Sequence, residues 1–242
     1  MSGADRRVPL ALEAPNQSFL AALEDFAPAR IAYSPDLGVT PVDPRIAEVC
    51  RAAAERFTEA GVEVAQAAPE LPGVKETFHT LRALIYAVTK GDLLAAHRDV
   101  IKADVVWNIE RGLALTLEEI AKAERNRAAL AAAAGDFFGR YDLLLTPTTI
   151  VPPFPVEQRF VERCGDHVFD NYVDWLAIAY VPTTLSLPAL SIPCGLLDGL
   201  PVGLQIVGPP RGEDAVLAAG RRLEELLALD WPVPMDPRTD RA

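Results

Sequence analysis

The feature that most restricts the fold is a strand–helix–strand pattern between Arg30 and Ala65. A β-type run, Arg30–Ser34, is followed by Asp43-Pro44, a capping residue with proline in the first helical turn. Apolar residues then recur at helical spacing: Ile46, Val49, Cys50, Ala53, Phe57 and Ala60. Gly61 ends this helix, and Val62–Ala65 begins a second strand. Two strands joined by a helix pair in parallel through a right-handed crossover, so the unit predicts part of a parallel sheet.

A second pattern, near the carboxyl end, adds antiparallel strands. The apolar runs Ala189–Cys194 and Val202–Val207 flank a turn that contains Leu197-Asp198-Gly199, and Gly208-Pro209-Pro210 ends the second run. Such runs indicate a hairpin of buried strands. The two patterns together predict an α/β fold with a mixed β-sheet flanked by helices.

Helices and one more strand fill the rest of the chain. A buried strand, Tyr141–Pro147, precedes a proline-rich loop over 147–165. The predicted helices are Ser18–Phe26, residues 73–104 with a break near Gly91, Leu117–Phe138 behind a capping box at Thr116, Asn171–Tyr180, and Glu213–Leu229. Residues 1–17 read as a lead-in that is poorly ordered or forms a surface strap. Residues 18–242 are predicted to form a single α/β domain.

Composition excludes some classes of partner. The net charge is −11, and the 4 lysines and 19 arginines are scattered, so no basic stripe for nucleic acid forms. No apolar run is long enough to span a membrane, and the first residues lack the apolar segment of a signal peptide. Cys50, Cys164 and Cys194 are widely spaced and odd in number, which favours reduced thiols. A cytoplasmic protein is therefore expected.

Four stretches of the chain resemble the carboxyl-terminal half of one enzyme family. They are "RIAYSPDLG" (30–38), "YDLLLTPTTIVPPFP" (141–155), "DWLAIAYVPTTLSLPALSIPCG" (174–195) and "GLPVGLQIVGPP" (199–210). Their content and order are similar to those of the amidase-signature family. The resemblance extends over nearly the whole chain from about Phe19 onward, and it implies the carboxyl-terminal portion of the amidase-signature fold.

The resemblance implies a chemistry whose catalytic parts are not evident here. Members of the family are serine amidohydrolases with a Ser-cisSer-Lys triad, carried by a Gly/Ser-rich loop that supplies oxyanion amides. The serines of this chain, Ser2, Ser18, Ser34, Ser186 and Ser191, are isolated from one another. Its lysines, Lys75, Lys90, Lys102 and Lys122, lie in polar, helix-like contexts where an ammonium group stays charged. We therefore assign no catalytic residue.

The resemblance thus implies the substrate-side portion of an amide (C–N) hydrolase that is inactive alone. Its expected partners are a complementary amino-terminal half or chain bearing the triad and a small amide substrate, without nucleic acid, membrane, metal or cofactor. A homo-oligomer remains possible. The alternative is a non-catalytic partner- or ligand-binding module derived from such an amidase.

Five residues are candidates for substrate contact. Thr148 and Thr149 follow the carboxyl end of a predicted strand, where open α/β sheets place ligands. Trp175 and Tyr180 lie on a segment that approaches the pocket in the family, although core packing is the commoner role of such aromatics. Phe78, Tyr86 and Trp107 present the same choice between pocket wall and core. Thr183 and Ser186 replace the Asn and Gly often found in the family, which indicates a reshaped loop. The polar and charged side chains with which relatives hold glutamine have no evident counterpart here, so glutamine is disfavoured as the substrate.

Two further sites are weighed and disfavoured. Cys194 as a thiol nucleophile needs a nearby histidine, and His79, His97 and His167 are all distant in sequence, so a buried structural cysteine is favoured. His167, with Cys164, Asp166 and Asp170 around it, fits no standard zinc spacing, and a surface loop is favoured.

Overall fold

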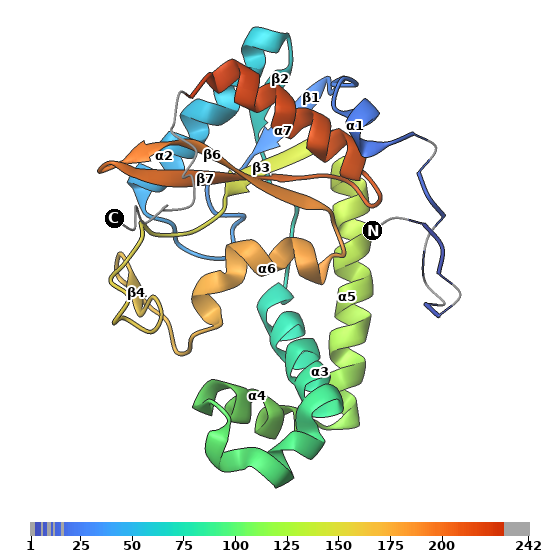
Figure 1. The fold of residues 1–242 in the computed structure, drawn as a ribbon, viewed down its shortest axis with the longest axis vertical. Helices are drawn as coiled ribbons and strands as arrows, with labels where there is room; N and C mark the ends of the chain where they lie inside the picture. Colours follow the sequence, from blue (N-terminus) through green and yellow to red (C-terminus); the bar gives the residue numbers. More distant parts are fainter. Residues whose placement is uncertain (1–2, 6, 9–10, 12, 16, 230–242) are drawn as a thin grey trace, which may run out of the picture.

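A five-stranded mixed sheet forms the centre of the molecule in a computed structural model that describes residues 3–5, 7–8, 11, 13–15 and 17–229 (Figure 1). Its strands are β1 (Arg30–Tyr33), β2 (Glu63–Gln66), β3 (Leu143–Pro147), β6 (Ala189–Leu197) and β7 (Leu200–Val207). They lie in the order β2-β1-β3-β7-β6, with β2, β1 and β3 parallel and β7 and β6 antiparallel to their neighbours. The predicted α/β fold with a mixed sheet is confirmed.

The predicted crossover is present with its predicted ends. Helix α2 (Pro44–Glu55) begins with proline in its first turn, and the Asp43 carboxylate accepts a hydrogen bond from the Arg45 backbone N–H at 2.9 Å. A 3₁₀ turn, η1 (Arg56–Ala60), continues the helix to Gly61, whose φ of +80° reverses the chain into β2.

The predicted hairpin is also present, and its turn explains its sequence. Asp198 and Gly199 have φ values of +52° and +78°, and two successive left-handed residues are what a type I′ turn requires. This turn matches the right-handed twist of paired strands, so it joins β6 to β7 directly.

Helices cover both faces of the sheet. Helix α2 and the last helix, α7 (Glu213–Leu227), lie on one face, and α6 (Ala177–Thr184) lies on the other (Figure 1). Successive residues of β3 alternate between the two cores, with Leu143 and Leu145 toward α2 and Leu144 toward the opposite side. The sheet is therefore buried on both sides, as its continuous apolar strands predict.

Three helices form an arm that extends from the sheet (Figure 1). They are α3 (Val74–His97), α4 (Ala103–Leu113) and α5 (Leu117–Phe138), and the predicted capping box of Thr116 and Glu119 is present at the start of α5. The predicted break near Gly91 is wrong, since α3 continues through it and ends at His97. Glycine lowers helix propensity by only about 1 kcal/mol, and packing of α3 against α4 and α5 offsets that cost.

The helix predicted over Asn171–Tyr180 begins later and ends later. A 3₁₀ turn, η3 (Asp174–Leu176), comes first, and α6 then continues through Pro182 to Thr184. Proline has no N–H to bond the carbonyl of Ile178 four residues earlier. The Gln205 side chain donates to that carbonyl at 3.3 Å from β7, so the helix tolerates the proline.

Two smaller differences from the sequence-based predictions remain. The first predicted helix is only one turn, α1 (Phe19–Ala22), and the predicted loop contains a two-stranded ribbon, β4 (Arg163–Cys164) with β5 (His167–Val168). Much of the predicted lead-in, Ser2 included, and residues 230–242 lie outside the described residues. No described helix combines the length and apolar character needed to cross a membrane.

Candidate active site

The loop that leaves the carboxyl end of β3 borders a small cavity of about 230 Å³. Thr148, Thr149 and Trp175 line it, together with Phe154 and Gly203. The hydroxyl groups of Thr148, just after β3, and Ser191, on β6, are hydrogen-bonded at 2.7 Å across the intervening strand β7. A Cβ atom at Gly203 would lie 2.9 Å from the Thr148 hydroxyl oxygen, so only glycine leaves room for this pair. Three of the five candidate residues therefore meet at one end of the sheet.

The Trp175 side chain forms one wall of this small cavity. Its ring packs edge-on against Phe154 with 5.9 Å between centroids. Its indole N–H is buried and has no hydrogen-bond partner among the described residues. Trp175 thus both packs against another aromatic ring and lines the cavity, which combines the two roles that the sequence left open.

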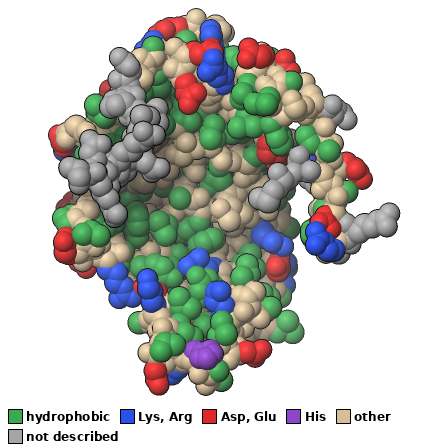
Figure 2. Space-filling model, in the orientation of Figure 1, with side chains coloured by type: hydrophobic (Ala, Val, Ile, Leu, Met, Phe, Trp, Pro, Cys, Tyr) green, Lys and Arg blue, Asp and Glu red, His purple; other side chains and the backbone are tan. Residues whose placement is uncertain are grey.

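The other two candidates, Tyr180 and Thr183, lie in a larger cavity of about 500 Å³. Its lining residues come from α3, α5, α6 and the segments directly before and after α6. Figure 2 shows hydrophobic side chains gathered in this region, with Lys or Arg side chains beside them. Its apolar lining includes Phe78 and Tyr86, whereas Trp107 packs edge-on against Tyr172 at 6.3 Å between centroids. The sequence-predicted residues are consequently divided between two cavities.

Tyr180 is held by aromatic stacking. Its ring lies parallel to that of Phe78, with centroids 3.8 Å apart and an interplanar angle of 6°. Only 5% of the residue is exposed, and its hydroxyl group has no hydrogen-bond partner among the described residues. Burial raises the pKa of this phenol, so Tyr180 is a neutral hydrogen-bond donor.

A buried His79–Asp174 pair was not anticipated from the sequence. His79 Nε2 lies 2.7 Å from Asp174 Oδ1, and the Asn171 side-chain amide donates to Asp174 Oδ2 at 2.8 Å. The pair joins α3 to the turn that precedes α6. The two residues are far apart in the chain, and no local pattern links them.

Burial lowers the pKa of His79 below its usual value of 6.5, and Arg111 and Arg82 act in the same direction, while Asp174 opposes them. The folded protein therefore holds His79 neutral, whereas the unfolded chain protonates it as the pH falls through about 6.5. The unfolded state then binds more protons, so acidification costs stability. We expect the free energy of unfolding to fall less in His79→Gln than in the wild type when the pH is lowered from 7.5 to 5.5. Urea denaturation at each pH measures this difference.

The control for this experiment is His97→Gln, which changes an exposed histidine at the end of the same helix. It should follow the wild-type dependence on pH. Identical pH profiles for wild type and His79→Gln would contradict a neutral, buried His79.

Ser186 has an unusual backbone where the chain turns from α6 toward β6. Its φ is +56°, a left-handed conformation that costs side-chain-bearing residues about 1–2 kcal/mol. We expect Ser186→Gly to raise the free energy of unfolding by about 0.5–1 kcal/mol in chemical denaturation. The gain is smaller than the full strain because glycine has more conformational entropy to lose on folding. Ser191→Gly, in an extended strand, should instead lower it. A loss of stability in Ser186→Gly would contradict this assignment.

The thiol site weighed from sequence has no general base beside it in the described part of the chain. Cys194 and Cys50 are buried with their sulfur atoms 3.9 Å apart, and the buried histidine, His79, is paired with Asp174. Hydrogen bonding to Cys194 and burial raise the pKa of Cys50. Among the described residues, no group of three or more His, Cys, Asp or Glu side chains is arranged to hold a metal ion.

Comparison with known proteins decides the family. Residues 1–217 match the model of the family described as Amidase. The chain belongs to the amidase-signature family. An acylamidase of Rhodococcus erythropolis is 30% identical over 234 residues, which are 93% of this chain and 48% of the acylamidase. A glutamyl-tRNA(Gln) amidotransferase component from Cenarchaeum symbiosum is 38% identical over 104 residues, 43% of this chain and 20% of that protein.

The fold of this amidase-signature chain is also found in solved structures. A bacterial aryl acylamidase of the same family superposes with a TM-score of 0.83 at 24% identity, covering 96% of this chain and 52% of that one. A 6-aminohexanoate cyclic dimer hydrolase gives 0.79 at 19% identity, covering 95% of this chain and 51% of that one. The chain thus spans about half the length of the Rhodococcus acylamidase and of these structures.

Within the described part of this amidase-signature chain, no serine is hydrogen-bonded to a lysine. Ser18 caps α1, Ser34 accepts from the Leu37 backbone N–H, and Ser191 pairs with Thr148. These contacts hold turns and strands in place. We therefore assign none of the described serines or lysines to the catalytic triad of the family.

Proposed function

We propose that this chain is the substrate-side, carboxyl-terminal portion of an amidase-signature enzyme that hydrolyses amide C–N bonds. The nucleophile, its serine partner and the lysine come from outside these 242 residues, either from further residues of the same polypeptide or from a partner chain. In this proposal the chain alone is inactive.

One observation carries the proposal: almost all of this chain, 93%, matches only 48% of an acylamidase. The serine content agrees with that division. The five serines, at positions 2, 18, 34, 186 and 191, are never adjacent, so none stands in the Gly/Ser-rich loop that the family chemistry requires.

Energetics explain why binding surfaces alone do not suffice. Enzymes lower reaction barriers by about 8–23 kcal/mol, chiefly through positioned nucleophiles, bases and oxyanion donors. Cavity walls supply orientation, but they supply neither an attacking atom nor a proton acceptor. Activity therefore depends on residues that approach these cavities from outside the chain.

Thr148, Thr149 and Trp175 at the end of the sheet, with Tyr180 and Thr183 between the sheet and the arm, are the proposed substrate contacts. The two cavities together offer hydroxyl donors beside aromatic surface, a combination typical of small-molecule sites. Three buried free cysteines fit a reducing compartment, so we place the protein in the cytoplasm as part of this proposal.

Two measurements test the proposal. Mass spectrometry of the native assembly should find either a second polypeptide in equal amount or a polypeptide longer than this one. The purified 242-residue chain should not hydrolyse a reporter anilide, whereas adding the complementary half should restore turnover. Hydrolysis by the chain alone at a rate that survives Cys194→Ala would refute the division of labour, and loss of that activity in Cys194→Ala would indicate a thiol enzyme.

The second candidate function is a non-catalytic module that binds a partner or a small ligand. The 500 Å³ cavity favours it, since that volume lies in the usual range for ligand sites. The outcome that selects this candidate is a native chain of this length that binds ligand but gains no activity from any complementary half.

A further inference from the structure

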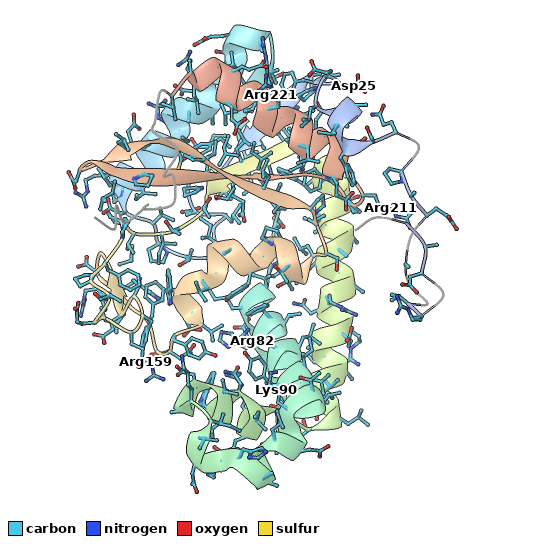
Figure 3. The ribbon with its side chains drawn as sticks, viewed as in Figure 1. Asp25, Arg82, Lys90, Arg159, Arg211 and Arg221 are labelled. Carbon is cyan, nitrogen blue, oxygen red and sulfur yellow. The ribbon has the colours of Figure 1, made fainter. Side chains whose placement is uncertain are left out.

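The wall of the larger cavity contains an arginine that forms no ion pair within the described part of the chain. Arg82, on α3, lines it (Figure 3). One guanidinium nitrogen donates to the hydroxyl groups of Tyr86 and Tyr172, each at 3.1 Å, and the guanidinium carbon lies 4.8 Å from the centre of the Tyr86 ring. The Nε–H is buried and has no partner among the described residues. The aromatic groups fix the side chain without neutralising its charge.

None of the described residues that line the cavity is acidic. Asp174 lies beside Tyr180, and its hydrogen-bond partners are the neutral His79 and the Asn171 amide. The second lining arginine, Arg127, pairs with Glu124 at 2.7 Å on the exposed side of α5. In the described part of the chain, Arg82 forms no ion pair. A buried N–H group of a cation that lacks a hydrogen bond costs free energy. The surroundings of Arg82 therefore favour binding of an anionic ligand.

A second unpartnered donor belongs to a residue of the same wall. Tyr180 lines the cavity and is only 5% exposed, and its buried hydroxyl group finds no acceptor among the described residues. The remaining wall is largely apolar, formed by Phe78, Leu81, Ile85 and Leu176 among others. Two residues of this largely apolar wall, Arg82 and Tyr180, therefore carry a buried donor without a partner among the described residues.

We infer that this cavity binds a molecule with an aromatic or other apolar body and a carboxylate, which accepts hydrogen bonds from Arg82 and Tyr180. The apolar body packs beside Phe78 and Ile85, and a charge-assisted hydrogen bond orients it. That this molecule is part of the amide substrate rests on the proposed function. That this chain binds such a molecule does not depend on the proposed function.

The test compares an acid with its neutral isostere. Binding of 3-phenylpropionate and of 3-phenylpropionamide to the purified chain is measured by isothermal titration calorimetry. We expect the acid to bind about tenfold more tightly, because a hydrogen bond to a charged group contributes more than a neutral one. Arg82→Met should abolish this preference, and Arg82→Lys should retain part of it.

The matched control is Lys90→Met, which removes a positive charge from the same helix farther along the arm (Figure 3). It should leave the preference intact. Tyr180→Phe keeps the ring stacked on Phe78 and should weaken binding of the acid. Circular dichroism of each variant confirms that it is folded.

Three results would overturn the inference: equal affinity for acid and amide, no binding of either by the folded chain, or a preference that survives Arg82→Met. The outcome is separate from that of the proposed function. A preference for the acid without restored amidase activity would leave the inference standing, whereas restored activity without the preference would overturn it alone.

Discussion

Replacing Gly112 by alanine should destabilise the protein by about 3 kcal/mol or more, since inserting atoms into a closely packed interface costs about 1–3 kcal/mol and occasionally more. An added Cβ at Gly112, on α4, would lie 2.0 Å from the Ala83 carbonyl oxygen and 2.7 Å from the Ala87 Cβ on α3. The first of these atoms belongs to the backbone, so no rotamer change relieves the clash. The two helices must separate, and their contact must be rebuilt.

Two other glycines serve as controls for the same substitution. A Cβ at Gly91, on α3, would meet only Leu113 Cδ2 at 3.9 Å, and one at Gly135, on α5, would meet nothing within 4 Å. Gly91→Ala and Gly135→Ala should each raise the free energy of unfolding by up to about 1 kcal/mol through helix propensity. Urea denaturation of the three variants separates the effects. A Gly112→Ala protein as stable as wild type would refute the close approach of α3 and α4.

Phe57→Ala should cost about 3–5 kcal/mol, the usual range for truncating a fully buried phenylalanine. Phe57 is 0% exposed, stacks on Phe26 with 5.6 Å between centroids, and belongs to the core between the sheet and α2. It lies in η1, where the crossover turns into β2, so the cavity left behind falls at the junction of the helix and the sheet.

Phe19→Ala is the control for this truncation, because 38% of Phe19 is exposed on α1. It should change the free energy of unfolding by about 1 kcal/mol or less. Equal losses in the two variants would contradict the placement of Phe57 in the core. The same urea experiment measures both.

Elements with local signals were predictable from the sequence. These signals are caps and turn residues that set the backbone conformation of only a few neighbouring residues. Each begins or ends its element as predicted: Asp43-Pro44, Gly61, Thr116 and Asp198-Gly199. The failures have long-range causes. The course of α6 through Pro182 depends on Gln205, which belongs to a strand that comes later in the chain.

The candidate site was predictable only in part for the same reason. Thr148 and Thr149 follow a strand end, a position that topology marks, and they line a cavity there. Arg82 and the His79–Asp174 pair gain their meaning from the packing of α3 against α6 and its neighbouring turn. No spacing within the sequence indicates which helix of the arm will face the sheet.

Strand β7 runs antiparallel to β3, so the loop after β3 and the first part of β7 lie at the same end of the sheet. Thr148 meets Gly203 there. At the opposite end of these strands, the Asp142 carboxylate accepts hydrogen bonds from the Ala29 and Arg30 backbone N–H groups at 2.7 and 2.8 Å, which joins the starts of β3 and β1. Substitutions for heat resistance or for attaching labels are therefore best made at the Asp142 end of the sheet, because they leave the end that borders the cavity unchanged.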